Sequence, residues 1–177
     1  MPALTTSEVA ALFDLDERRI RKDVEYGVFG AFESPPRFGV PEVVYLYAIA
    51  GLGVELGVDD RKKLYGKVAG ALRSKSPSDV HLSAYVVVRL LAALRDVEAR
   101  LRDFSKWKAK LVEREDILGG EPVFPKSRLA VRHVGEMARR GATAEIIADY
   151  PRLRSRDVEF ARRYAAAYPR VGRPRGG

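Results

Sequence analysis

The chain has 177 residues, of which 46% are hydrophobic and 32% charged, a formal net charge of +8 and an isoelectric point of about 9.8. The length suits one large domain or two small ones, and the apolar content is high enough for a core, which excludes a wholly disordered chain. Cysteine is absent, so disulfides, thiolate nucleophiles and cysteine-ligated zinc are excluded as well.

The positive charge makes nucleic acid the first partner to consider, because clustered cations neutralise phosphates and release counterions. The alternative is an evenly basic surface that only keeps the protein in solution. The most apolar stretch, residues 43–54, is too short for a bilayer, which needs about 20 residues. The first residues lack the basic and apolar regions of a signal peptide. We therefore expect a cytoplasmic protein that does not enter membranes.

Two short helices joined by a tight turn are predicted for residues 5–25. Thr5 and Glu8 have the spacing of a capping box, in which each side chain accepts a hydrogen bond from the other residue's backbone. The apolar positions that follow with helical spacing are Val9, Leu12 and Phe13. The pattern then breaks, and Asp16 is a good N-cap for the second helix.

The second helix is predicted to direct its positive side chains into solvent. Ile20 and Val24 are four residues apart and should face the core. At 100° per residue, Arg18 and Lys22 then point away from the core. The flanks of this outward face carry Arg19 and Arg21. The second helix of a DNA-binding helix-turn-helix needs this arrangement, because it shows long donors to base edges and phosphates; the alternative is a solvated helix face of mixed charge.

A small hairpin or wing is predicted between this helix and the next one. Gly27 can stop the second helix, and short extended pieces flank the prolines at residues 35–36. Pro41 stands where a further helix can begin. The positions that continue this helix with apolar spacing are Val43, Leu46, Tyr47 and Ala50.

Four short runs within residues 1–57 are similar to one family pattern. They are Ser-Glu-Val-Ala-Ala-Leu at 7–12, Ile-Arg at 20–21, Glu-Tyr-Gly-Val-Phe at 25–29 and Arg-Phe at 37–38, followed by a helix. This order resembles the winged helix-turn-helix of MerR-type regulators, in which a basic–aromatic pair precedes the helix after the wing. The resemblance implies a DNA-binding domain over residues 1–57. The candidate DNA-binding residues are Arg18, Arg19, Arg21, Lys22 and Arg37.

Residues 58–112 are predicted to form a connecting and dimerisation region. A helix over residues 59–72 is followed by a polar connection, one β-strand over 82–88 and a helix from Arg89. The apolar stripe of this last helix is Leu90, Leu94, Val97, Leu101 and Phe104. Such a stripe is typical of core packing or of a dimer seam, and we expect a homodimer. Trp107 lies among three lysines, where an indole can stack on a base.

A short hairpin followed by three helices is predicted for residues 113–168. The glycines at 119–120 can supply a turn, and residues 123–124 a short strand. The inward residues of the first helix are Val131, Val134 and either Met137 or Ala138. Gly141 is expected to stop this helix. The predicted N-caps of the two later helices are Thr143 and Ser155.

The same segment is similar to a widespread bacterial domain, formerly of unknown function, that occurs in VapB-like antitoxins accompanying PIN-domain toxins. The matching residues are Ile-Leu-Gly-Gly-Glu-Pro-Val at 117–123, Arg128, Val131, Gly141, Glu145, Ile146, Asp149, Tyr150, Pro151, Leu153, Asp157 and Val158. The family carries Gly-Thr-Arg at the corner where this chain has Lys126, Ser127 and Arg128, so only the arginine is kept. The resemblance implies an antitoxin-type helical domain over residues 113–168.

Residues 169–177 hold two prolines, three glycines, three arginines and no acid, which predicts an extended basic tail that cannot build a core. By the resemblance, its partner is a PIN-domain ribonuclease, whose active site gathers several carboxylates. Arginine suits such a site because its planar guanidinium binds carboxylates in a bidentate way. The candidate toxin-binding residues are Arg170, Arg173 and Arg175. The alternative is a basic end that contacts DNA without specificity or has no partner.

These observations predict a mainly α protein with small β elements that binds DNA and a protein partner. With the two resemblances, they predict an antitoxin of a type II toxin–antitoxin system, which neutralises a PIN-domain ribonuclease toxin and represses its own operator. The alternative is a one-component transcription regulator without a toxin partner. The two histidines, His81 and His133, stand in no nucleophile, phosphate-binding or metal-ligand pattern. We therefore expect no enzyme activity, no metal and no cofactor.

Overall fold

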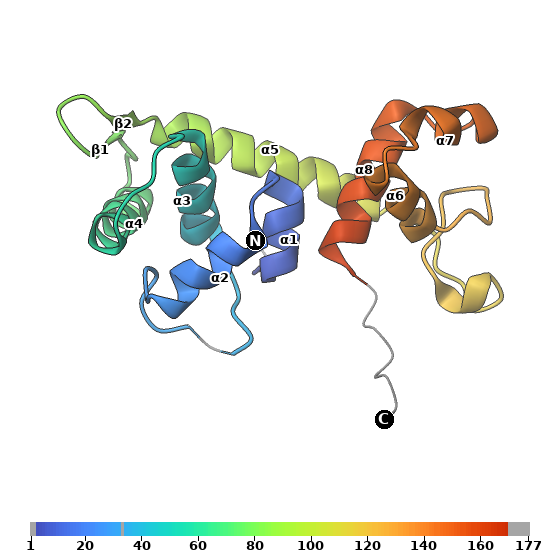
Figure 1. Cartoon of the computed structure of the whole chain (residues 1–177), viewed down its shortest axis with the longest axis horizontal. Helices are drawn as coiled ribbons and strands as arrows, with labels where there is room; N and C mark the ends of the chain where they lie inside the picture. Colours follow the sequence, from blue (N-terminus) through green and yellow to red (C-terminus); the bar gives the residue numbers. More distant parts are fainter. Residues whose placement is uncertain (1–2, 33, 170–177) are drawn as a thin grey trace. The chain divides into compact units, whose positions relative to one another are not determined.

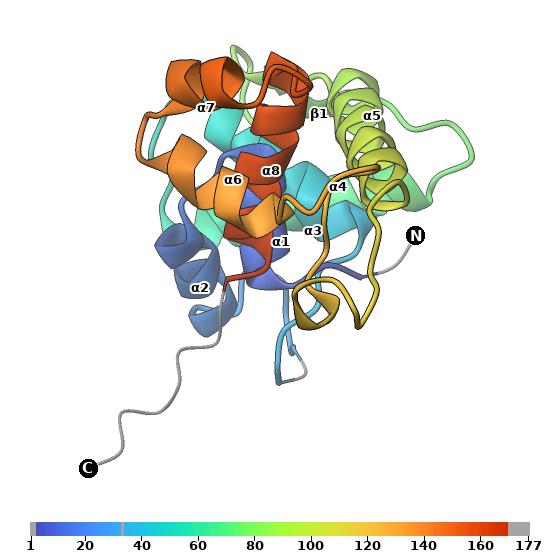
Figure 2. The ribbon, with the colours of Figure 1, turned by 90° about the vertical axis from the view of Figure 1, so that its right-hand side faces the viewer.

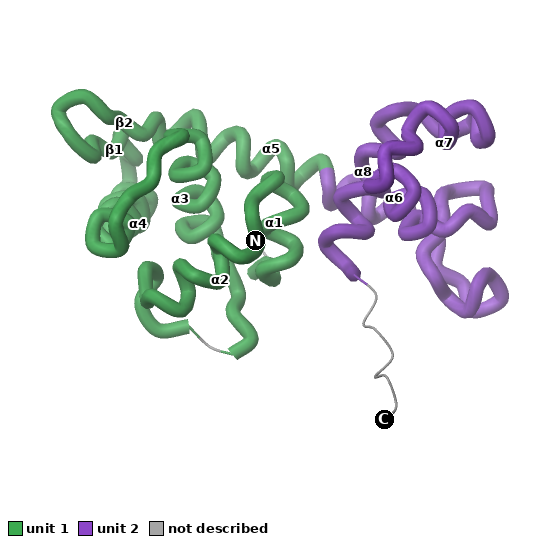
Figure 3. Tube along the Cα trace, in the orientation of Figure 1, with its two compact units in different colours: residues 1–103 green, residues 104–177 purple. Residues whose placement is uncertain are grey.

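The computed structural model describes residues 3–32 and 34–169, and the chain divides into two compact units, Met1–Asp103 and Phe104–Gly177 (Figure 3). Eight α-helices, one short 3-10 turn and one two-stranded hairpin make up the regular structure of the described residues (Figure 1). The predicted mainly α fold with small β elements is confirmed. None of the helices in these ranges combines the length and apolarity that a membrane crossing requires.

The boundary between the units falls inside helix α5 (Leu90–Lys108). The sequence instead predicts domain boundaries after residues 57 and 112. Residues 58–103 belong to the same compact unit as the first helices, and the region predicted to connect two domains contributes to the core of the first one.

The first unit begins with α1 (Thr6–Phe13) and α2 (Glu17–Glu25), joined by a short turn. Both predicted caps are confirmed. The Glu8 backbone N–H donates to the Thr5 hydroxyl oxygen at 3.2 Å, and the Thr5 N–H donates to the Glu8 carboxylate at 2.8 Å. Asp16 accepts a backbone N–H from the first turn of α2 at 2.9 Å. The side-chain caps satisfy donors that a helix start leaves unpaired.

Helix α2 ends at a glycine, as predicted. Gly27 has a φ of +64° and donates its N–H to the Val24 carbonyl oxygen at 3.0 Å. The next N–H, of Val28, bonds to the Asp23 carbonyl oxygen at 2.9 Å. This pair of bonds closes the last helical turn and needs a left-handed residue, which glycine adopts without strain.

The described residues between α2 and the next helix form no hairpin, so the prediction of one there is wrong. Residues 28–31 form turns and bends, and Phe38 pairs instead with Leu4 through two backbone hydrogen bonds of 2.8 and 2.9 Å. The Phe29 ring centroid lies 5.5 Å from that of Phe32 and 5.9 Å from that of Phe38. The segment folds around this aromatic cluster, because burying large rings stabilises it more than a short exposed ladder would.

Helix α3 (Val40–Gly51) forms the core of the first unit together with α4 (Val58–Arg73), against which it packs. Of the positions predicted to face inward from α3, Val43 and Leu46 are buried, and α4 adds the buried side chains of Leu64 and Val68. Ala50, also predicted inward, is exposed. Tyr45 is buried beyond the predicted stripe, since its ring packs on Phe29 with a centroid distance of 5.5 Å. Packing from several sides therefore buries a wider face of α3 than one stripe.

A hairpin replaces the single strand predicted over residues 82–88. Strand β1 (Val80–His81) pairs antiparallel with β2 (Val87–Val88). The Ser83 hydroxyl oxygen accepts the N–H groups two and three residues further on, both at 3.2 Å, which closes the loop. In α5, the predicted apolar stripe is confirmed by the buried residues Leu90, Val97 and Leu101.

The second unit holds three helices after a turn, as predicted: α6 (Val131–Arg139), α7 (Thr143–Asp149) and α8 (Ser155–Ala167). In place of a continuous strand, Val123 forms isolated β-bridges to two segments. Helices α6 and α8 lie side by side in both views (Figure 1, Figure 2). Their crossing requires Gly135, because a Cβ atom there would overlap the carbonyl oxygen of α8 that faces it.

The helix ends of the second unit match the predictions only in part. Gly141, with a φ of +91°, stops α6 as predicted. Thr143 and Ser155 are the first residues of their helices instead of the N-caps. At the start of α8, the Asp157 carboxylate accepts the Arg154 N–H at 2.7 Å. The predicted caps are therefore displaced by one residue.

Candidate functional site

The outward face of α2 carries the cations that the sequence predicts there. Ile20 is 1% exposed, whereas Arg18 and Lys22 are exposed. With the half-buried Arg19, they line a hollow of about 580 Å³, which we call the α2 hollow. The other residues of its lining are Asp16, Glu55, Leu56 and Arg61. Three of the five candidate DNA-binding residues therefore share one concave surface.

Arg21 and Arg37 do not line the α2 hollow. The Arg21 guanidinium bonds to the Glu17 carboxylate at 2.6 Å and lines a different hollow of about 400 Å³, beside Pro35 and Pro36. Arg37 is exposed in the loop that precedes Phe38. Arg21 is thus engaged with a carboxylate on another side of the same helix.

A buried carboxylate fastens α2 to the rest of the first unit. Asp23 is fully buried and forms a hydrogen-bonded ion pair with Arg61 of α4. Burial raises the pKa of Asp23, and the positive charges of Arg61 and Arg19 oppose that rise. Burial, together with the negative Asp23, raises the pKa of the neighbouring Tyr45 hydroxyl of α3 well above its ordinary value. Removing either member of the pair would leave the other charge without its partner and lower the free energy of unfolding by about 3–5 kcal/mol.

The prediction from sequence missed this pair and placed Val24 inward, where the structure leaves Val24 half-buried. Asp23 lies three residues after Ile20 and shares its inward face, a spacing that could have revealed it. Its partner Arg61 lies in another helix, so no local pattern joins the two. The pair locks the rotation of α2 and thereby holds Arg18 and Lys22 on the outer surface.

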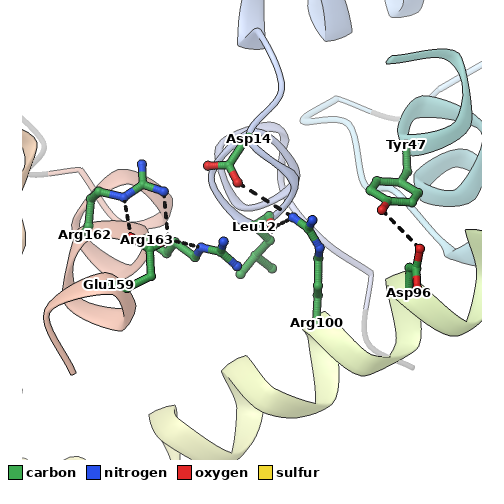
Figure 4. A network of polar contacts seen from close by, with 8 residues as sticks. All are labelled: Leu12, Asp14, Tyr47, Asp96, Arg100, Glu159, Arg162 and Arg163. Atoms are coloured by element: carbon green, nitrogen blue, oxygen red, sulfur yellow. Dashed lines mark hydrogen bonds and ion pairs between the residues drawn. The ribbon is translucent and has the colours of Figure 1, made fainter. Parts of the chain in front are cut away.

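The turn between α1 and α2 is held by α5. The Arg100 guanidinium lies 3.7 Å from the Asp14 carboxylate and 3.5 Å from the Leu12 carbonyl oxygen (Figure 4). One helical turn earlier on α5, Asp96 accepts a hydrogen bond from the Tyr47 hydroxyl of α3 at 3.3 Å. Arg100 therefore supports the turn between α1 and α2, and the hydrogen bond from Tyr47 to Asp96 ties α5 to α3.

The whole net charge of the chain lies in the second unit. Residues 1–103 contain 15 Lys and Arg against 15 Asp and Glu, and residues 104–177 contain 17 against 9. The exposed cations in the described part of this unit include Lys126, Arg128, Arg139, Arg140, Arg152, Arg154 and Arg156. The second unit therefore carries a net positive charge, whereas the first unit is neutral overall and its cations are clustered only locally, in the α2 hollow.

A groove of about 740 Å³ lies on the second unit, and we call it the C-terminal groove. It is lined by Trp107, by the corner at residues 124–129 and by the connection between α7 and α8. Its apolar side chains are Trp107, Phe124, Pro125, Leu129, Tyr150, Pro151 and Leu153. Its charged side chains are Lys126, Asp149, Arg152 and Asp157. The groove thus offers an apolar wall with charged groups around it.

Trp107, the only tryptophan of the chain, packs within the second unit. Its ring stacks on Phe160, with centroids 5.8 Å apart and 25° between the ring planes. The Lys110 ammonium lies 4.5 Å from the ring centroid, and the Arg156 guanidinium carbon 5.6 Å from it. Trp107 therefore joins the core to the C-terminal groove, a role that needs no stacked base.

On α8, Glu159 accepts hydrogen bonds from Arg162 at 2.9 Å and from Arg163 at 2.8 Å (Figure 4). The hydrogen bond from Arg162 is the largest of the causes that hold the pKa of Glu159 below its ordinary value. The candidate toxin-binding residues Arg170, Arg173 and Arg175 lie outside the described residues.

The two histidines lie apart from both surfaces. His81 is in β1 and His133 in α6, and both are exposed. Neither lines the α2 hollow or the C-terminal groove. In residues 3–32 and 34–169, no group of three or more His, Asp and Glu side chains is placed to hold a metal ion.

Residues 112–165 match the family described as a protein of unknown function, DUF433. The matched segment contains every lining residue of the C-terminal groove except Trp107. No curated protein and no solved structure matched the chain. The match identifies a C-terminal domain of unknown function and leaves residues 1–111 without a family.

Proposed function

We propose that the chain is a DNA-binding antitoxin: α1 and α2 bind operator DNA as an autorepressor, and the second unit with its tail binds and inhibits a PIN-domain ribonuclease. The observation that carries the DNA half is the outward display of Arg18 and Lys22 on a second helix whose rotation the buried Asp23–Arg61 pair fixes. We also expect a homodimer, as helix-turn-helix repressors bind paired half-sites.

The α2 hollow suits the backbone and base edges of a duplex. Long guanidinium and ammonium side chains reach phosphates and bases, and a good base contact contributes about 1–3 kcal/mol of discrimination. A rigid helix is needed, since a contact contributes to specificity only when its geometry is held in advance. The Asp23–Arg61 pair and the contact between Arg100 and Asp14 supply that rigidity.

The toxin half rests on the likeness of residues 117–158 to antitoxin domains and on the charge of the second unit. A ribonuclease site that gathers carboxylates is complementary to a unit with 17 cations against 9 acids. Arg170, Arg173 and Arg175 are the proposed direct ligands of those carboxylates. Each charge-assisted hydrogen bond contributes about 1.5–3 kcal/mol, from which the cost of ordering the tail is subtracted.

The DNA half is tested by reversing charge on two sides of α2. The double variant Arg18→Glu, Lys22→Glu should bind the chain's own promoter duplex at least about 100-fold more weakly, because two contacts become repulsive. Arg21→Glu is the control on the same helix, since Arg21 is bonded to Glu17 away from the α2 hollow. Fluorescence anisotropy at low ionic strength measures both. Equal promoter affinity of the double variant and the unchanged chain would remove α2 from the interface.

The toxin half is tested with the protein encoded next to this chain's gene. If that protein is a PIN-domain ribonuclease, adding the chain should abolish its RNA cleavage, and deleting residues 169–177 should restore cleavage. Cleavage that continues at saturating concentrations of the full chain contradicts the antitoxin assignment.

A one-component regulator is the second candidate, and the C-terminal groove is the observation that favours it. Its volume of about 740 Å³ falls within the range of small-molecule sites, about 300–1,000 Å³. That function requires promoter binding that changes with a small apolar ligand and no effect on any ribonuclease. The same promoter and cleavage assays therefore separate the two functions.

A further inference from the structure

We infer that the C-terminal groove is the docking site for an apolar side chain carried on an acidic segment of the protein partner, the ribonuclease of the proposed function, on which this inference rests. The tail would then supply contacts to the active site, and the groove would hold a second, separate part of the same partner.

The shape and lining of the groove favour a protein side chain as occupant. Its walls come from a tryptophan, a tyrosine, a phenylalanine, two leucines and two prolines around a volume of about 740 Å³. Apolar pockets of this kind anchor single large side chains at the centre of protein interfaces. The phosphate backbone of DNA offers no apolar group to fill such a pocket, and protein–DNA interfaces are polar and basic.

The walls are held in place before any partner binds. At the corner, the Ser127 hydroxyl donates to the Phe124 carbonyl oxygen at 3.0 Å and accepts the Leu129 N–H at 3.2 Å. In the opposite wall, the Leu153 N–H bonds to the Tyr150 carbonyl oxygen at 2.9 Å. A site ordered in this way loses little conformational entropy on binding.

Charge around the groove selects an acidic segment. Lys126 and Arg152 line it, and Lys110 and Arg156 lie over the ring of Trp107. Two carboxylates also line it, and one of them, Asp157, is bound to the backbone N–H that starts α8. The lining is thus balanced in charge, and Lys110 and Arg156 beside it make four of the six charged groups positive, within a unit that carries all of the chain's net charge. An acidic segment gains from that field, and a basic one is repelled.

The test compares charge changes inside and outside the groove, in the full-length chain. Arg152→Glu should weaken binding of a catalytically inactive form of the neighbouring PIN-domain protein by about tenfold, because a groove contact becomes repulsive. Arg154→Glu makes the same charge change two residues further on, outside the lining, and should cost less than about twofold. Isothermal titration calorimetry at physiological ionic strength measures the dissociation constants.

A second variant separates binding from folding. Lys126→Gly removes a cation from the groove and replaces a side chain at a left-handed residue, with a φ of 56°, where glycine is unstrained. Its melting temperature should be no lower than that of the unchanged chain. Its affinity for the PIN-domain protein should nevertheless be several-fold weaker. Arg128→Gly, in the same corner but outside the lining, is its control for binding.

Trp107 reports on the groove directly, since it is the only tryptophan and lines the wall. In the chain labelled with 5-fluorotryptophan, the single ¹⁹F resonance should shift on saturation with the PIN-domain protein and stay in place on saturation with promoter duplex. If the PIN-domain protein binds tightly without shifting the resonance, and binds the Arg152→Glu variant with equal affinity, the groove is not its docking site. The antitoxin function is left intact by that result. A shift caused by duplex DNA alone also overturns it. Absence of any binding by the unchanged chain overturns the proposed function and this occupant together.

Discussion

Lys126 holds a backbone conformation that few residues with a side chain adopt. Its φ of 56° lies in the left-handed region, at the corner that forms one wall of the C-terminal groove. The domain family that this segment resembles in sequence carries glycine at the same place in its Gly-Thr-Arg corner. A left-handed backbone costs a residue with a Cβ atom about 1–2 kcal/mol. Lys126 thus places a cation where the backbone conformation favours glycine.

Lys126→Gly should therefore raise the free energy of unfolding by about 0.5–1 kcal/mol, the strain relieved less the extra freedom that glycine gives the unfolded chain. Urea unfolding followed by circular dichroism measures the change. Lys126→Ala keeps the Cβ atom and should give no gain. If the alanine variant is stabilised as much as the glycine variant, the backbone explanation does not hold.

Glu159 gives the second unit a predictable dependence on pH. Its hydrogen bonds with Arg162 and Arg163 place its pKa below the ordinary value of 4.5. Because the folded-state pKa is the lower one, the stabilisation is present above the unfolded-state pKa and is lost as pH falls through the folded-state pKa. Glu159→Gln should thus flatten the loss of stability on the acid side of 4.5. An NMR titration of the carboxylate checks the pKa, and identical acid unfolding of both proteins would contradict the assignment.

At the scale of elements, α6 and α8 can pack closely because Gly135 has no side chain. A Cβ atom at Gly135 would overlap the Ala161 carbonyl oxygen and stand 2.6 Å from the Ala165 Cβ. Overlap with a helix backbone cannot be relieved by rotating a side chain, so the helices would have to separate. Gly135→Ala should lower the free energy of unfolding by about 3 kcal/mol.

Gly70→Ala is the matched control in α4, where a Cβ atom meets nothing within 4 Å. It should raise stability by about 0.5–1 kcal/mol, because alanine has the higher helix propensity. Thermal unfolding of the two variants should therefore shift in opposite directions. A neutral Gly135→Ala variant would show that the two helices can pack without close backbone approach.

The helices were predictable because their signals are local. Apolar spacing predicted α1 to α6 and α8, a cap residue predicted α7, and the glycines at 27 and 141 marked two helix ends correctly. The errors arise where distant segments decide the structure. Phe38 pairs with Leu4 instead of its own neighbours, and Asp23 is buried because Arg61 of another helix meets it. The C-terminal groove escaped prediction for the same reason, since its walls come from three separate stretches of sequence.

At the scale of the molecule, the boundary after Asp103 and the family match starting at residue 112 disagree about where the C-terminal domain begins. The residues between them include Phe104 and Trp107, whose ring centroids lie 5.4 and 5.8 Å from that of Phe160. Phe160 is 5% exposed and belongs to the core of the second unit. The last turns of α5 therefore complete the domain that the family match outlines.

A fragment of residues 104–177 should accordingly fold alone, and a fragment of residues 112–177 should be less stable by at least about 2 kcal/mol. Each aromatic pair contributes about 0.5–1.5 kcal/mol beyond burial, and the shorter fragment also exposes the apolar surface of Phe160. Thermal melts by circular dichroism compare the two, and Trp107→Ala in the longer fragment should account for part of the difference. Equal melting temperatures would place the true domain start at residue 112 and make the end of α5 a connector.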